Sequence, residues 1–420
     1  MAGSRTTSLT FLHTGDPTGL KFTVEHGEAR CIFDFGREHA PGRAAFSMGL
    51  NPRPGRELAD LLALGAAPRL EGVYAGQEYD GRTQVFITHL HLDHTALVQY
   101  LHPQVPLHYP AGMEPVRRDA AACGYLPWRE PRGRPHTDGE EVRVGEISVR
   151  FAAVDHDVPG ATGYLIRTPD LTIAFTGDCR RHGLHPERTE AFAVAARGCD
   201  LLIQECVGLA ALLPPADGFM PAPLSEAEAA AEIERAVTTC RGLVFSNLYG
   251  MNRERVRALA AACRRAGRRL LMDRTSAGLA GWDDVLSPTS VGMAAASPRE
   301  YCIQLGFDSL PELIDLRPPP GSRYIHSGGS PLGPYDPSWN VMLAWLRTFD
   351  LELVLVGCSG HSRPADLEWL AAEVWPKAVA PVHTRAPELL LAPGIPKLIP
   401  EVARPYSAED VIRLAATARS

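Results

Sequence analysis

The run Thr88-His89-Leu90-His91-Leu92-Asp93-His94 follows directly on the apolar stretch Val85-Phe86-Ile87. Its three imidazoles and one carboxylate cannot all point the same way on a helix or a strand, so the run predicts a loop at the end of a strand. Neutral imidazole and carboxylate together suit Zn²⁺ or a neighbouring first-row ion. The first two histidines can converge on one ion while Asp93 and His94 turn toward a second. The run therefore predicts a metal site, with a solvated histidine-rich loop as the alternative.

Two further strand ends downstream carry residues that bind metals. The segment Asp155-His156-Asp157-Val158-Pro159-Gly160 follows the alternating run 147–151, and Gly177-Asp178 follows the apolar run 171–175. A single histidine after a strand is usually a satisfied surface or core residue, and a Gly-Asp pair is usually a turn. Because both segments end strands and follow the histidine-rich run, we predict that they complete the same site.

In this order, the three segments resemble the metallo-β-lactamase-fold hydrolases. An N-terminal strand at 9–12, a second strand ending at 32–36 and the segment Arg180-Arg181-His182-Gly183 are similar to the same family. The resemblance implies an α/β fold, namely the αββα sandwich of that family.

Beyond residue 200 the resemblance narrows to the β-CASP nucleases, typified by ribonuclease J and the cleavage-factor endonuclease. Three segments carry it: Leu201-Leu202-Ile203-Gln204-Glu205, Ser359-Gly360-His361-Ser362-Arg363 and Pro381-Val382-His383-Thr384. This branch has an inserted α/β domain. A composition break at 213–218, followed by a strand–helix–strand pattern, agrees with an insert.

We accordingly predict three segments along the chain. Residues 1–206 form the first part of the metallo-β-lactamase domain, residues 207–350 form the inserted β-CASP domain, and residues 351–420 form the second part of the first domain.

Carried over residue by residue, the resemblance implies a dinuclear zinc site, with manganese as an alternative metal. One ion would be held by His89, His91 and His156, the other by Asp93, His94 and His383, with Asp178 as the bridge. Two such ions lower the pKa of a shared water toward about 7 and clamp the oxygens of a displacement at phosphorus. The nucleophile would be metal-bound hydroxide.

The same resemblance implies the remaining catalytic and binding residues. The catalytic set is Asp93, Glu205 and His361, and the phosphate-binding set is Ser359, Ser362 and Arg363. His361, paired with Glu205, would protonate the leaving oxygen, since a histidine pKa lies near working pH. The alternatives are that Glu205 and His361 tie the two domains together, and that the serines are only helix caps.

The implied function is hydrolysis of single-stranded RNA, cut to leave a 5′ phosphate, in a cleft between the two domains. The chain departs from the family at Cys206-Val207 and at Thr384-Arg385. These departures keep open a second function, hydrolysis of a small phosphoester or acyl substrate in specialised metabolism. A non-catalytic RNA-binding protein is a third, disfavoured by the complete ligand set.

The charge of the chain limits how it can contact RNA. The 420 residues carry a formal net charge of −7, which argues mildly against a protein that coats nucleic acid. Only three of the 42 basic residues are lysine, and the arginines cluster at 129–134, 180–181, 253–257 and 264–269. Arginine suits phosphate contact, so 180–181 is a candidate, but a GC-rich genome explains the clusters equally well.

Other features of the sequence predict a cytoplasmic protein without membrane association. No apolar run approaches the roughly 18 residues of a membrane span, and the first residues lack a signal-peptide pattern. The nine cysteines include no Cys-x-x-Cys pair, so no disulfide framework is expected. The oligomeric state is left open.

Overall fold

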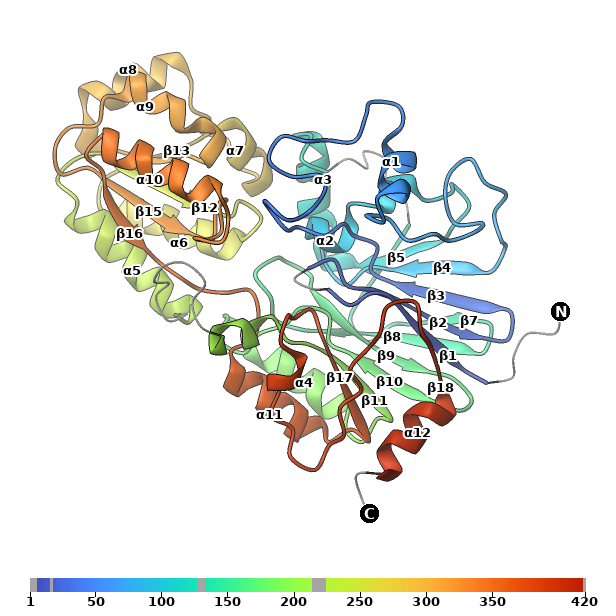
Figure 1. Cartoon of the computed structure of the whole chain (residues 1–420). Coiled ribbons are helices and arrows are strands. Elements are labelled where there is room, and N and C mark those ends of the chain that lie inside the picture. Colours follow the sequence, from blue (N-terminus) through green and yellow to red (C-terminus); the bar gives the residue numbers. More distant parts are fainter. Residues whose placement is uncertain (1–5, 16–17, 127–132, 214–223, 418–420) are drawn as a thin grey trace.

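The computed structural model of the chain describes residues 6–15, 18–126, 133–213 and 224–417, which form two units (Figure 1). The first unit contains two sheets packed face to face. The second, which we term the inserted unit (residues 224–357), contains a separate five-stranded sheet.

The two sheets of the first unit have seven and six strands. The seven-stranded sheet has the order β18-β1-β2-β3-β4-β5-β6, and the six-stranded sheet has the order β17-β11-β10-β9-β8-β7. The strands of the first sheet are β1 (Ser8–His13), β2 (Lys21–His26), β3 (Ala29–Phe33), β4 (Thr83–Phe86), β5 (Leu107–Pro110), β6 (Arg134–His136) and β18 (Pro405–Ser407). Those of the second are β7 (Glu141–Val144), β8 (Ile147–Ala153), β9 (Thr162–Arg167), β10 (Thr172–Phe175), β11 (Leu201–Glu205) and β17 (Ala378–Val382).

An apolar core fills the space between these sheets. Phe22 stacks on Phe33 with ring centroids 4.9 Å apart, and Phe175 of the facing sheet meets Phe22 edge-on at 4.9 Å. This alternation of inward-facing apolar side chains from both sheets is what holds two sheets face to face.

Helices cover both outer faces of the sandwich. The seven-stranded sheet is covered by α1 (Glu57–Ala63), α2 (Leu92–Thr95), η1 (Val98–Tyr100), η2 (Ala111–Met113) and α3 (Glu114–Ala122). The six-stranded sheet is covered by α4 (Pro186–Ala195), η3 (Val207–Leu212), α11 (Pro364–Val374) and η6 (Pro387–Leu389), while α12 (Ala408–Thr417) packs at the β17–β18 end. The predicted αββα sandwich is confirmed.

The inserted unit is a three-layer α/β unit with a wholly parallel sheet. The strand order is β13-β14-β12-β15-β16. The strands are β12 (Val244–Leu248), β13 (Arg269–Met272), β14 (Tyr301–Gln304), β15 (Arg323–Ser327) and β16 (Glu352–Leu355). Helices α5 (Glu226–Thr239), α6 (Arg253–Arg265) and α7 (Arg274–Ala280) pack on one face, and α8 (Pro288–Ala296), η4 (Pro298–Glu300), η5 (Phe307–Glu312), α9 (Leu313–Leu316) and α10 (Ser338–Thr348) lie on the other side.

Local sequence signals set where two of these helices begin. Ser225 and Glu228 form a capping box at the start of α5, since each side chain accepts from the backbone N–H of the other. Asn252 caps α6 by accepting from the amide of Arg255.

The structure differs from the sequence prediction at both edges of the inserted unit. Strand β16 was expected to belong to the first unit, but it pairs with β15, so the chain returns only after Leu355. At the other edge, Leu209 of η3 packs with α11 in the first unit, beyond the predicted boundary at 206. An apolar run predicts a buried strand but not the sheet that it joins. Most of the composition break at 213–218 lies outside the described residues.

Two shorter segments differ from what their sequences predict. The apolar run at 96–101 predicts a helix, but the structure has a single turn, α2, followed by η1. The segment 112–140, whose proline, glycine and arginine content predicts an irregular surface excursion, contains α3 and β6.

The two units touch directly at α3 and α7. A Cβ atom at Gly278 would lie 2.4 Å from the Cβ of Cys123, and Arg253 pairs with Asp119 across the same contact. Met251 and Leu279 extend this contact into the apolar cluster of the first unit. The junction is therefore a packed interface on this side.

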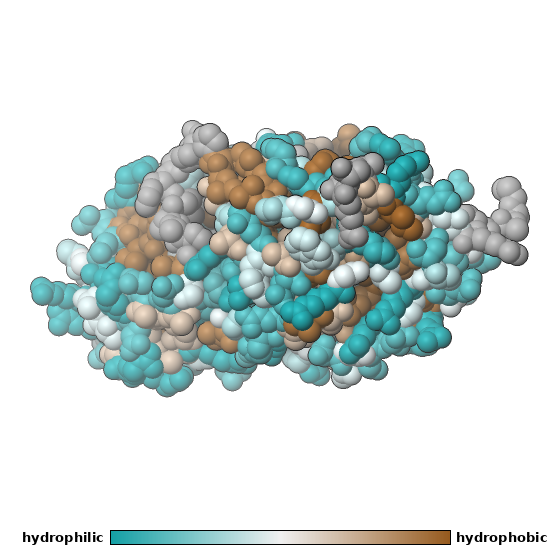
Figure 2. Space-filling view, turned by 90° about the horizontal axis from the view of Figure 1, so that it is seen from below, coloured by the Kyte–Doolittle hydropathy of each residue, from teal (hydrophilic) through white to brown (hydrophobic). Residues whose placement is uncertain are grey.

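The surface and the cysteines agree with the composition. Hydrophilic side chains cover most of the face seen from below, and hydrophobic ones form separate groups (Figure 2). Among the described residues, no helix is long and apolar enough to cross a bilayer. All nine cysteines are free thiols.

Candidate metal centre

The seven predicted ligands come together at one edge of the sandwich, in two groups. One group is His89, His91, His156 and Asp178, and the other is Asp93, His94 and His383. Within each group the donor atoms lie within 4.8 Å of one another. Oδ2 of Asp178 lies 3.5 Å from Nε2 of His89 and 3.2 Å from Nε2 of His94, so this carboxylate faces both groups.

The strand ends explain why residues so far apart in sequence meet. The first run follows β4, Asp178 follows β10, and His383 follows β17. Strands β10, β11 and β17 run parallel, so their carboxyl ends share one edge of the sheet. His383 has a left-handed backbone (φ 56°), and its amide donates to the carbonyl of Thr14, which fixes the turn that presents the ring.

Hydrogen bonds at the outer nitrogens orient three of the rings. Nδ1 of His94 bonds to Asp34 (2.8 Å), Nδ1 of His89 to Oγ1 of Thr88 (3.0 Å), and Nδ1 of His156 to the carbonyl of Gly360 (2.6 Å). When the second nitrogen of a histidine is held in this way, the ring and its tautomer are fixed and Nε2 is left for a metal.

Asp34 supports the centre although it is not one of the predicted site residues. It is fully buried at the end of β3, in a left-handed conformation (φ 58°) that aspartate tolerates. It accepts from both the amide and the hydroxyl of Thr88 as well as from His94. An acid at a buried strand end was the only signal in the sequence, and the pairing with His94 is visible only in the fold.

The inner donor atoms fit a divalent cation. Nε2 of His89, Nε2 of His94 and both carboxylate oxygens of Asp178 are buried and have no hydrogen-bond partner among the described residues. Such atoms are costly unless something pairs with them. Nitrogen and oxygen atoms that converge in this way are the donor set of a zinc site.

Protonation at the centre mostly favours metal binding, which requires neutral imidazoles and ionised carboxylates. Burial lowers the pKa of His89, and lowers that of His156 to about 3. Burial opposes ionisation of Asp178, but the surrounding imidazoles hold its pKa well below the usual range. Burial also lowers the pKa of His94, but Asp178, Asp93 and Asp34 outweigh it and raise that pKa, so a metal would have to displace a proton there.

His361 and Glu205 lie beside the ligands, as the sequence predicted. Nδ1 of His361 is 3.6 Å from Oε2 of Glu205 and 3.7 Å from Oδ2 of Asp178. Glu205 is fully buried and accepts from the amides of Val207 and Ser362. Burial disfavours the charged ring of His361, but the two carboxylates raise its pKa to about 9. The two carboxylates thus favour the protonated form of this ring.

One edge of the centre is open to solvent. The side chains of His361, His91, Asp157 and Asp93 are 21, 18, 17 and 14% exposed, whereas those of His89, His94 and His383 are at most 1% exposed. Asp157, which sequence reasoning gave no role, has Oδ1 3.3 Å from Nε2 of His91. A substrate would approach the centre along this edge.

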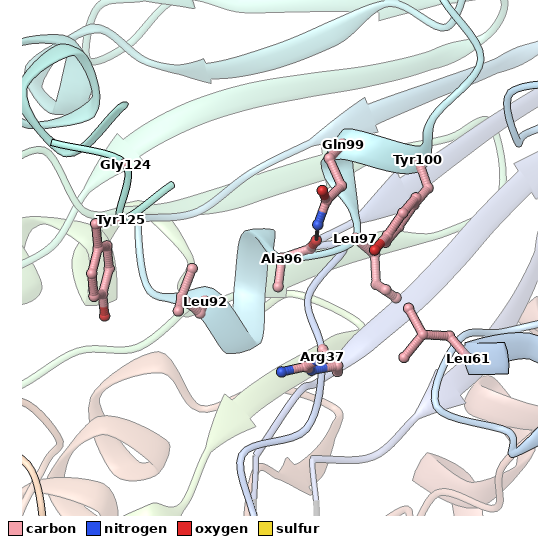
Figure 3. A pocket seen from close by; sticks show the side chains of 9 residues that line it. All are labelled: Arg37, Leu61, Leu92, Ala96, Leu97, Gln99, Tyr100, Gly124 and Tyr125. Atoms are coloured by element: carbon pink, nitrogen blue, oxygen red, sulfur yellow. Dashed lines mark hydrogen bonds between the residues drawn. The ribbon is translucent and has the colours of Figure 1, made fainter. Parts of the chain in front are cut away.

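Aromatic residues from both units border the open edge. The ring of Tyr249, after β12, lies 5.3 Å from that of His91 and shares a hydrogen bond with Tyr125 of the first unit. Tyr125 also lines a cavity of about 220 Å³ together with Arg37 and Leu92 (Figure 3). In that view the cavity lies along α2, the short helix that also contains Asp93 and His94 of the centre.

The three predicted phosphate-binding residues differ in how accessible they are to a substrate. Ser362 is buried; its hydroxyl donates to the carbonyl of Cys179 (2.9 Å) and its amide to Glu205. It is therefore not available to a substrate, and that prediction is corrected. Oγ of Ser359 accepts from the amide of His361 (3.0 Å), so it shapes this turn. Arg363 is half-buried at the N-terminus of α11.

Comparison with known proteins agrees with this geometry. Residues 50–239 match the family model of the β-lactamase superfamily domain, and this segment carries six of the seven converging residues, all except His383. The two-sheet unit has the metallo-β-lactamase fold.

The similarity to two other proteins covers a larger share of the chain. Ribonuclease J of Sinorhizobium meliloti is 24% identical over 372 residues, which cover 79% of this chain and 63% of that protein. The chain thus spans about 63% of the length of this relative. A crystal structure of a protein of unknown function from Enterococcus faecalis V583 is 29% identical, with a TM-score of 0.80, and covers 96% of this chain and 100% of its own.

Most arginines of the clusters that the structure describes are buried or paired within the protein. Arg180 is fully buried, so the expectation that it contacts phosphate is wrong. Arg181 pairs with Glu190 and Asp366, and Arg268 donates to four backbone carbonyls. Residues 129 and 132 of the first cluster lie outside the described residues.

Proposed function

We propose that the chain is a dinuclear-zinc phosphodiesterase of the β-CASP type that hydrolyses single-stranded RNA, with the inserted unit as the β-CASP domain. One observation carries the proposal. His361 and Glu205 stand outside both ligand groups, yet His361 lies 3.7 Å from Asp178, which faces both groups. A hydrolase that only needed metals would have no use for a histidine held by a buried acid at this place. The similarity to ribonuclease J supports the substrate class.

The residues of the chain would act as follows. Two zinc ions, when bound by the seven ligands, supply a water of lowered pKa and positive charge for the substrate phosphate. His361 donates its proton to the leaving 3′ oxygen, and Glu205 holds the ring in place. Asp93, at the open edge, orients the attacking water as well as serving as a ligand. Cleavage in this direction leaves the phosphate on the 5′ end of the product.

The junction favours a single strand over a duplex. The units touch at α3 and α7, and a Cβ atom at Gly42 of the first unit would lie 3.1 Å from Pro337 of the inserted unit. A substrate bound at the centre would also lie against the inserted unit, since the ring of Tyr249 is 5.3 Å from that of His91. An extended strand with splayed bases suits contact with two units at once.

The salt dependence of RNA binding should be shallow. The net charge is −7 and the described members of the arginine clusters are largely paired or buried, so few phosphates can be neutralised. We expect the logarithm of the affinity to fall against the logarithm of salt with a slope no steeper than about −3, since each phosphate on a single strand contributes about −0.7. Fluorescence anisotropy of a labelled oligonucleotide measures it. A slope near −7 would require a basic track that these contacts do not provide.

Asp34→Asn should weaken zinc binding, because the amide no longer provides the charged partner of His94. We expect a loss of about 10–100-fold in affinity, the usual effect of removing such a partner. Competition with a chromogenic chelator measures it. Asp200→Asn is the matched control, since Asp200 pairs with Lys377 at the opposite end of β11 and should leave the affinity unchanged. Equal affinities of wild type and Asp34→Asn would contradict the role given to Asp34.

A second candidate function is hydrolysis of a small phosphoester. Two observations favour it. Ser362 and Arg180 are buried and bonded within the protein, so they are not available to the phosphates of an RNA strand. Cys206, where the chain departs from the family, is also buried. A substrate panel separates the two. Zinc-reconstituted protein is incubated with 5′-labelled single-stranded RNA and with small phosphate diesters, phosphate monoesters and acyl esters. The RNA proposal expects cleavage of the oligonucleotide with 5′-phosphate products, and turnover of a small ester with intact RNA would replace it by the second candidate.

A further inference from the structure

Three buried charges meet where the inserted unit joins the first unit. Arg180 follows β10, Glu226 is the first residue of α5, and Arg255 lies on α6; their residues are 0, 3 and 2% exposed. Oε2 of Glu226 accepts from Nη1 of Arg180 (2.9 Å) and from Nη2 of Arg255 (2.8 Å), while Oε1 accepts from Nε of Arg255 (2.8 Å). Glu226 therefore holds two guanidinium groups, one from each unit.

The triad is bonded to the backbone of the catalytic segments. Nη2 of Arg180 donates to the carbonyl of His156 (3.3 Å), and its Nη1 donates to that of Ser359 (3.2 Å). Arg255 donates to the carbonyl of Cys358 (3.1 Å). The two segments that Arg180 contacts are those that carry His156 and His361.

The surroundings of the triad leave no room for adjustment. A Cβ atom at Gly183 would lie 1.9 Å from Oδ2 of Asp155 and 2.5 Å from Nε of Arg180. At Gly360 it would lie 2.7 Å from Cε1 of His156. Packing this close transmits a shift of one group to the next. A displacement of Arg180 would therefore also displace His156 at the metal centre and the turn before His361.

We propose that Glu226 is a positioning residue of the metal centre. It pairs with both Arg180 and Arg255 and so keeps Arg180 on the carbonyls of His156 and Ser359, in the geometry that zinc binding and proton donation by His361 require. Without the carboxylate, Arg255 would lose the acid with which it pairs, and Arg180 would keep only Asp155, 3.8 Å from its Nε. The two buried guanidinium groups would then be undercompensated, and Arg180 would leave its backbone partners. The inserted unit thus contributes to the geometry of the centre itself.

The test compares Glu226→Gln with Glu228→Gln. Glu228 lies in the same first turn of α5 but is exposed and bonds only to Ser225 among the contacts described. In Glu226→Gln we expect zinc release to a chelator to accelerate by about 10-fold or more, the size of effect seen when a metal ligand loses its support. The Glu228→Gln control should release zinc at the wild-type rate.

A kinetic readout separates positioning from mere stabilisation, and it rests on the proposed function. On labelled RNA, kcat per folded, zinc-loaded site should fall by about 10–100-fold in Glu226→Gln, with KM within about 3-fold, because an interaction needed for the chemical step is lost. Removing the uncompensated charge in Glu226→Gln/Arg255→Gln should restore part of kcat. A purely stabilising triad would lower Tm and leave both zinc release and kcat per folded site unchanged, which would overturn the proposal.

The outcomes for the inference and for the function are distinguishable. If wild type leaves RNA intact, the proposed function fails, while the zinc-release comparison still decides the role of Glu226. If Glu226→Gln does not fold, Glu226→Asp replaces it, since it keeps the charge and shortens the side chain by one methylene. Faster zinc release in that variant supports the proposal, and release at the wild-type rate contradicts it.

Discussion

His361→Ala is expected to keep its zinc and to lose RNA cleavage by about 10²–10⁴-fold, the range for a positioned general acid. His361 belongs to neither ligand group, and its ring lies beside Glu205 and Asp178 at the open edge. Removing the ring takes away the proton donor for the leaving oxygen but leaves all seven ligands. Single-turnover cleavage of 5′-labelled RNA, with zinc content measured on the same sample, tests both halves.

His102→Ala provides the control for that variant. His102 belongs to the first unit and stacks on Tyr79, outside both ligand groups, so its loss should change neither cleavage nor zinc content. An unchanged rate in His361→Ala would remove this residue from the mechanism. Loss of zinc in His361→Ala would mean that it acts as a ligand, a role now given to His383.

Asp178→Ala should abolish zinc binding at both positions and all activity with it. Oδ2 of Asp178 lies 3.5, 3.2 and 3.6 Å from Nε2 of His89, His94 and His383, so this carboxylate serves both groups. Its loss also leaves the imidazoles around it without a counter-charge. A change of any single histidine removes a donor from only one group.

Elemental analysis after reconstitution checks this ranking. Wild type should hold about two zinc ions per chain, the number that two-metal hydrolysis uses. His89→Ala and His383→Ala should each lose less zinc than Asp178→Ala. Asp178→Asn keeps an oxygen but no charge, so its zinc content should lie between that of the histidine variants and that of Asp178→Ala. If Asp178→Ala retained as much zinc as the histidine variants, Asp178 would not be the bridge.

The sequence alone can single out the proposed ligands because most of them lie at the end of a strand with a clear apolar pattern. His89, His156 and Asp178 follow such strands, and the fold brings those ends to one edge. A strand end is a local signal, so it can be recognised in the sequence without knowledge of the fold. The pairing of His361 with Glu205 needed the family resemblance, since nothing local links residues so far apart.

What the sequence could not predict depends on long-range contacts. The carbonyl of Gly360 that holds His156 comes from more than two hundred residues away, and a backbone carbonyl has no sequence signature. Ser362 looks like an exposed helix-start serine, yet it points inward to Cys179. The Arg180–Glu226–Arg255 triad likewise resembles ordinary surface charge until the two units are packed together.

The most direct measurement is a zinc titration of RNA cleavage. Metal-free protein receives increasing zinc, and the cleavage rate of 5′-labelled single-stranded RNA is followed at each addition. The rate should rise until about two equivalents are bound and then level off, because both ions act on one phosphate, and the products should carry 5′ phosphates. A rate that levels off at one equivalent, or RNA that stays intact at full zinc occupancy, would contradict a dinuclear ribonuclease.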